Sequence, residues 1–140
     1  MSKKLKIISK ILITLYIISI ILSISPLYSM INFFGFIGTI LSTAFIYIVI
    51  MFILCFFLYK KNIKAIFISF VSSLFVLLTS TIFFNPDYGL VGSLKLVFVR
   101  LVNGHLQIFA MSLLAWLIPI VAGIGIIFYL IDQNKNSTKD

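Results

Sequence analysis

The feature of this sequence that most constrains its fold is a series of long apolar runs that carry almost no charge. The run 35–59 contains no charged residue at all. Hydrophobic residues make up 62% of the 140-residue chain and charged residues 10%, whereas soluble globular domains average roughly 45–50% and 25%. A soluble domain of this size cannot bury so much apolar surface, so the sequence predicts an integral membrane protein.

Four runs are long enough for membrane helices, each of which needs roughly 20 predominantly apolar residues. We expect an all-α integral membrane protein with four transmembrane helices in a single membrane domain, residues 1–140. The predicted helices cover about 7–25, 35–59, 65–84 and 106–131, and a polar tail, 132–140, is expected to be disordered.

The first run, 7–25, also has features of a cleaved signal peptide, namely a basic start and small residues at its end. Two features favour a retained helix instead. The apolar part exceeds the usual length of roughly 7–15 residues, and Pro26 stands where the mature chain would begin. We expect Pro26 to end this helix, because its ring and missing N–H disfavour continuation.

The basic residues predict how the chain is threaded. Of the 11 Lys and Arg residues, all but Lys95 and Arg100 lie before or at the start of the first run, in the turn 60–64, or after the last run. The positive-inside rule therefore predicts a multi-pass protein of the cell membrane with cytoplasmic N- and C-termini. Since these flanks account for the net charge of +8, we expect no nucleic-acid partner. The abundance of Ile, Phe, Lys and Asn favours a prokaryotic source.

The segment between the third and fourth runs is placed on the outer face by this threading. From 90 to 102, apolar residues recur with a helical period, and Lys95 and Arg100 lie on the opposite side. We expect a short amphipathic helix here, lying at the membrane interface. It must end near Gly104, because an unbroken helix over 90–131 would be about 63 Å long, twice the hydrocarbon core.

The same outer segment contains the polar residues best suited to contact a lipid headgroup or a partner. They are Asp87, Lys95, Arg100 and His105. The two cations suit the phosphates of outer-leaflet lipids. The alternative is that all four residues form only the solvated face of the interfacial helix and the start of the fourth span.

Residues that carry catalysis are sparse. His105 is the only His and Cys55 the only Cys, and no Asp or Glu lies within a predicted span. A metal site needs about three or four ligands, and transport coupled to a membrane carboxylate needs that carboxylate. Ser93, His105 and Asp87 could be written as a triad, but no strained nucleophile turn accompanies them. We expect no enzymatic activity, no cofactor and no metal ion.

Small and bent positions predict how the helices pack. Small residues four apart let two helices approach closely, inside one chain or between chains. The predicted packing residues are Gly35, Gly38, Ser42, Ser69 and Ser73. Pro119 lies in the middle of the fourth run and is expected to bend its helix, either as a fixed shape or as a hinge.

The leading functional prediction is a multi-pass membrane protein without a catalytic site. It would act through helix–helix contacts, as a subunit, an accessory protein or an immunity-type protein. Its partners would be the lipid bilayer and either another membrane protein or further copies of itself. The alternative is a small oligomeric transporter, channel or lipid flippase that uses the hydroxyl-rich third run and the bend at Pro119.

Overall fold

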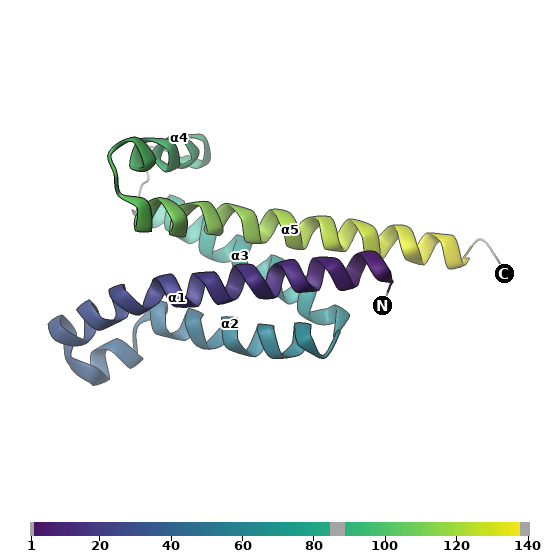
Figure 1. Ribbon diagram of the computed structural model, residues 1–140, viewed down its shortest axis with the longest axis horizontal. Helices are drawn as coiled ribbons and strands as arrows, with labels where there is room; N and C mark the ends of the chain where they lie inside the picture. Colours follow the sequence, from purple (N-terminus) through teal and green to yellow (C-terminus); the bar gives the residue numbers. More distant parts are fainter. Residues whose placement is uncertain (1, 85–88, 138–140) are drawn as a thin grey trace.

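The computed structural model describes residues 2–84 and 89–137, and these residues form helices joined by short turns (Figure 1). The helices are α1 (Lys3–Ile40), α2 (Thr43–Tyr59), α3 (Ile63–Phe84), α4 (Gly89–Val102) and α5 (Leu106–Ser137). The predicted all-α class is confirmed for the described residues.

Four of these helices form a bundle. Within it, α1 packs against α2 and α5, while α3 packs against α5 and α2; α4 lies outside, against α5 and α3. Two helices, α1 and α5, are each long and apolar enough to cross a membrane. The other two bundle helices contain shorter apolar stretches, Phe45–Tyr59 and Ile63–Leu78.

The two ends of the bundle differ in charge and in what they hold. Both termini lie at the same end as the turn between α2 and α3, whereas the α1–α2 connection and α4 lie at the other end (Figure 1). We call the first the basic end, because it gathers the lysines of the N-terminus and of the turn 60–64. We call the other the open end. The basic groups that the sequence separates are therefore neighbours in space.

The core is concentrated toward the basic end. Along α1, side chains are buried on successive turns at Leu5, Ile8, Leu12 and Tyr16. Beyond Ser19, no residue of α1 is buried until Thr39. The other buried hydrophobic side chains of this cluster are Met51, Leu54, Leu58, Ala65, Ile66, Leu114, Ile118 and Ala122.

A close approach at Gly125 fixes the packing of three helices at the basic end. A Cβ atom added to Gly125 would lie 2.9 Å from Cγ2 of Ile66 on α3 and 3.0 Å from Cγ2 of Ile8 on α1. Both neighbours are β-branched and therefore stiff at χ1. Only glycine fits at this point of α5 without a shift of the neighbouring helices.

The turn between α2 and α3 is closed by hydrogen bonds of its own. Lys61 adopts a left-handed conformation with φ 57°. Its N–H donates to Leu58 O at 2.9 Å, and the N–H of Asn62 donates to Phe57 O at 3.0 Å. The Asn62 side chain then accepts from Lys64 N–H at 3.0 Å. This pair of backbone bonds is a Schellman ending, followed at once by the start of the next helix.

The predicted end of the first helix at Pro26 is not observed. The helix α1 continues through Pro26, and its first non-helical residue is Gly35, with φ 70° and ψ 175°. The helix then resumes for 36–40 before it ends. The physical reason is that the carbonyl freed by Pro26 finds another donor, Gln107, as described below.

The predicted continuous helix over 35–59 is interrupted as well. The chain breaks at Leu41, and Ser42 is the N-cap of α2, where its Oγ accepts from Phe45 N–H at 3.2 Å. Gly38 and Ser42 therefore do not share one helix face. Ser42 satisfies an otherwise unpaired helix-start N–H, which is a common role of serine at this position.

Of the other two predicted helix boundaries, one is confirmed and the other is wrong. The break near Gly104 is confirmed, since α4 ends at Val102 and Gly104 has φ 75°. The N–H of His105 donates to Arg100 O at 3.0 Å, which closes this helix end. In contrast, α5 does not end at Ile131 but continues to Ser137. The predicted disordered tail is therefore helical over 132–137. Pro119 lies inside α5, and the predicted bend stays a prediction.

Candidate functional site

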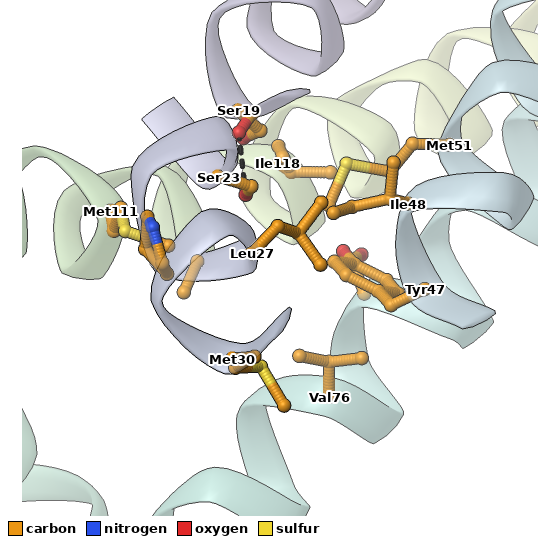
Figure 2. A pocket seen from close by; sticks show the side chains of 13 residues that line it. Ser19, Ser23, Leu27, Met30, Tyr47, Ile48, Met51, Val76, Met111 and Ile118 are labelled. Atoms are coloured by element: carbon orange, nitrogen blue, oxygen red, sulfur yellow. Dashed lines mark hydrogen bonds between the residues drawn. The ribbon is translucent and has the colours of Figure 1, made fainter. Parts of the chain in front are cut away.

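A cavity of about 220 Å³ lies among the four bundle helices on the side of the open end. It begins where the buried core of α1 stops, at Ser19. Figure 2 shows Leu27 and Met30 of α1 facing Tyr47 of α2 and Val76 of α3 across it. The remaining lining residues are Ser19, Ser23, Pro26, Ile48, Met51, Ser73, Met111, Ala115 and Ile118. Among the described residues, no charged side chain lines this cavity.

The wall of the cavity contains four hydroxyl groups, two of which are engaged by the backbone. Ser23 Oγ donates to Ser19 O at 2.8 Å, and Ser73 Oγ donates to Ser69 O at 2.6 Å. Within the described part of the chain, the hydroxyl hydrogens of Ser19 and Tyr47 are given to no protein acceptor. The cavity therefore presents two unused donors on an otherwise apolar surface.

The backbone carbonyl that Pro26 frees beside this cavity accepts a hydrogen bond from α5. Pro26 has no N–H, so Leu22 O loses its helical donor four residues on. Gln107 Nε2 donates to this carbonyl at 2.9 Å. A neighbouring helix thus satisfies the backbone group that the proline frees, which lets a proline persist inside an apolar helix.

Deeper in the bundle, hydroxyls of α1 and α3 meet without regular hydrogen bonds. The hydroxyl of Tyr16 adjoins Ser69 and Ser72 and lies near Tyr47. Among described residues, the buried oxygens of Ser9, Tyr16 and Ser69 have no hydrogen-bond partner. Leaving a buried hydroxyl unpaired costs about 1–3 kcal/mol, so this row of hydroxyls is not explained by packing alone.

The residues predicted as an outer-face contact are not gathered into one site. Lys95 and His105 are exposed, and Asp87 lies outside the described residues. Arg100 is half-buried, and its guanidinium donates to Ser112 Oγ on α5. No group of three or more potential metal ligands occurs in the described ranges. Arg100 therefore ties α4 to α5, and contact with a lipid headgroup or partner stays a prediction.

The residues predicted to pack helices fall into two groups. Ser69 and Ser73 are buried inside the bundle, with 0% and 3% of their surfaces exposed. Gly35 and Gly38 are exposed: an added Cβ would meet nothing within 4 Å at Gly35 and only Phe34 of the same helix at Gly38. Within the described part of the chain, no other helix meets an added Cβ at either glycine, and packing against another chain stays a prediction.

Sequence reasoning missed several residues of this region. The need for a donor near Leu22 could have been deduced from Pro26, but the donor itself, Gln107, could not. In the sequence, Tyr47 is one more aromatic residue of an apolar run. Only the structure shows that it faces a cavity lined by three other helices. The role of Gly125 could not be predicted, because nothing in the local sequence distinguishes it from Gly123.

Comparisons with protein-family models, with curated protein sequences and with solved structures find no match for this chain. The function proposed below is therefore supported by the residues and their geometry.

Proposed function

We propose that this chain is a non-catalytic, multi-pass protein of the cell membrane that acts through helix–helix contacts with another membrane protein or with a second copy. The bundle helices α1, α2, α3 and α5 would each cross the bilayer, with α4 at the outer interface. The gathering of the lysines at one end supports cytoplasmic N- and C-termini, since such clusters mark the cytoplasmic side.

The observation that carries this proposal is the uncovered last part of α1. This segment, residues 28–41, projects past the ends of α3 and α5 (Figure 1). Its side chains are largely apolar, and the most exposed of them, Phe33, has 88% of its surface uncovered. Phe34, Phe36, Ile37 and Leu41 are all at least 68% exposed. We call this segment the α1 tip.

The bilayer core alone is too thin to cover the tip. The uncharged part of α1 begins after Lys10 and continues through Leu41. Its continuous helical part, up to the break at Gly35, extends about 36 Å, against a hydrocarbon core of roughly 30 Å. The surplus falls at the tip, where aromatic and aliphatic side chains need a cover other than lipid tails.

The backbone of the tip also suits a close partner. Among the described residues, no other helix comes within 4 Å of the place that a Cβ atom of Gly35 or Gly38 would occupy. Exposed small residues on an apolar helix are typical of contacts between membrane helices. The proposed partner is therefore an apolar helix that packs on the face containing these two glycines.

Site-specific photo-crosslinking tests the proposal. A benzoylphenylalanine at Phe33 is expected to give one discrete adduct in native membranes, at twice the chain mass for a second copy or at another fixed mass for a different protein. The control is the same probe at Phe52 of α2, which is 58% exposed and would face lipid. Absence of any protein adduct from Phe33, or equal adducts from both positions, would contradict the proposal.

Threading is tested with single cysteines in a Cys55→Ala background. Ser93→Cys is expected to react with an impermeant thiol reagent in intact cells. Lys61→Cys is expected to react only after lysis. The reverse result would overturn the proposed orientation, while leaving the crosslinking test of the tip intact.

A transporter, channel or flippase is the second candidate, supported by the buried hydroxyls that extend from Ser9 and Tyr16 toward the cavity. Reconstituted vesicles would then show flux or lipid scrambling that disappears in Ser72→Leu or Pro119→Ala. No flux from folded protein, together with the Phe33 adduct, favours the helix-contact function.

A further inference from the structure

The cavity at the open end has the composition of a binding site for a small neutral molecule rather than of a packing defect. Its wall combines aliphatic side chains with hydroxyls drawn from three different helices, α1, α2 and α3. No charged side chain of the described residues takes part, and an ion would lose its hydration there without a counter-charge. Its occupant should therefore be uncharged.

The unused donors define the polar part of the occupant. Ser23 and Ser73 already donate to backbone carbonyls. Ser19 on α1 and Tyr47 on α2 have O–H groups that no described acceptor takes, and both line the cavity (Figure 2). Tyr47 is half-buried, and a hydroxyl on an apolar wall is stabilised by a hydrogen-bond acceptor placed beside it. A ligand oxygen that accepts hydrogen bonds, such as a carbonyl, would satisfy them.

The size of the cavity limits the apolar part. A volume of about 220 Å³ exceeds the roughly 150 Å³ that holds benzene in an apolar protein cavity. It falls below the roughly 300 Å³ at which pockets for drug-sized molecules begin. One ring or one short hydrocarbon chain fits, whereas a whole lipid does not.

Three methionines favour a flexible chain as the occupant. Met30, Met51 and Met111 come from α1, α2 and α5 and meet at this cavity. Unbranched thioether side chains adapt to ligands of variable shape and are frequent at adaptable apolar surfaces. The cavity is also partly open to its surroundings, so an occupant can enter without unfolding of the bundle.

We propose that this cavity binds a short hydrocarbon chain that carries a carbonyl-type oxygen, with Ser19 and Tyr47 as donors to that oxygen. The chain would belong to a free small molecule or to one ester-linked chain of a membrane lipid. This site is separate from the α1 tip and does not depend on the partner proposed there.

Photolabelling in lipid nanodiscs tests the site. The probes are a diazirine-bearing octan-2-one and the matching octane, which has no oxygen. The ketone is expected to label Met30, Met51 and Met111 saturably, in preference to the lipid-facing residues Ile120 and Ile124, which are 52% and 43% exposed. The octane is expected to label mainly the lipid-facing residues.

Two kinds of variant test the hydroxyl donors and the cavity volume separately. The double variant of Ser19→Ala and Tyr47→Phe removes both donors and should lower ketone labelling of the cavity about 5- to 100-fold, as expected for two lost hydrogen bonds. Labelling of Ile120 should not change. Ala115→Phe fills the cavity and should abolish its labelling by both probes, whereas Ile120→Phe, on the outside of the same helix, should not.

Two results would overturn the proposal: equal labelling of the cavity by ketone and octane, or ketone labelling that the double variant leaves unchanged. The double variant keeps the test valid if Ala115→Phe does not fold. Nanodiscs of ether-linked lipids distinguish the two sources. If a lipid ester is the natural occupant, ketone labelling rises in them; if a free molecule is, it stays the same. Either result supports the site.

Discussion

At the basic end, three helices meet around Gly125 with no room for a methyl group, whereas at the open end four helices surround a cavity of about 220 Å³. Both ends are built from the same residue types, chiefly Ile, Leu and Phe. The difference lies in whether large side chains fill the space beside the small residues. Ile8 and Ile66 do so at Gly125, whereas the space beside Ser19, Ser23 and Ala115 stays open. One bundle can therefore combine a rigid half with a half that accommodates a ligand.

The contrast predicts opposite responses to added volume, and the largest effect is expected at Gly125. Gly125→Leu should lower the free energy of unfolding in detergent by about 1–3 kcal/mol, because the side chain must displace Ile8 and Ile66. The control is Ile124→Leu, which faces outward and should change it by less than about 0.5 kcal/mol. An unaltered unfolding free energy for Gly125→Leu would remove the distinction between the two ends.

The same substitution can be placed at two positions of α5 that lie two turns apart, one beside the cavity and one in the tight core. Ala115→Leu extends a side chain into the cavity and should raise the unfolding free energy by about 0.5–2 kcal/mol, as cavity-filling changes commonly do. Ala122→Leu lies on the same helix but is fully buried, with 0% of its surface exposed. It should lower the unfolding free energy by about 1–3 kcal/mol. Equal destabilisation by both variants would mean that the open end is as tightly packed as the basic end.

A smaller change in the unfolding free energy is expected from loss of the hydrogen bond between Gln107 and Leu22 O. Gln107→Leu should lower the unfolding free energy by about 0.5–1.5 kcal/mol, because Leu22 O is left without a donor. In a Pro26→Ala background the helix supplies its own N–H, and the same change should cost almost nothing. This double-mutant cycle measures the coupling between residues 26 and 107. The same loss in both backgrounds would show that Gln107 acts in another way.

The smallest change in the unfolding free energy is expected in the turn 60–64, between α2 and α3. Lys61→Gly should raise the unfolding free energy by about 0.5–1 kcal/mol, since glycine adopts the left-handed conformation of this position without strain. Lys60→Gly, at φ −70°, offers no such relief and should be neutral or destabilising. The pair is compared by thermal unfolding at constant pH, and a lower midpoint for Lys61→Gly than for Lys60→Gly would contradict the assignment.

Features set by local chemistry could be predicted from the sequence. Long apolar runs predict the all-α class, and helical periodicity predicts α4. Gly104 predicts the end of α4, because glycine adopts the left-handed conformation there without help from a distant residue. The turn 60–64 follows from its polar residues. In each case the deciding residues are close neighbours along the chain.

Features that depend on a distant partner could not be predicted. Pro26 interrupts a helix unless another chain segment satisfies Leu22 O, and that donor is 85 residues away. Gly38 and Gly125 look equally suited to packing, yet only Gly125 meets other helices. The cavity is an absence of contact among four helices, and no single run of residues encodes it.

The bond from Gln107 to Leu22 has a consequence for how the helices find each other. Apolar faces rich in Ile and Leu look much alike after a shift of one helical turn, about 5.4 Å, so they align α1 and α5 poorly. Such a shift would strand both the freed carbonyl and the amide in apolar surroundings. The hydrogen bond between Gln107 and Leu22 therefore favours one alignment of α1 and α5 over others that bury a similar amount of apolar surface.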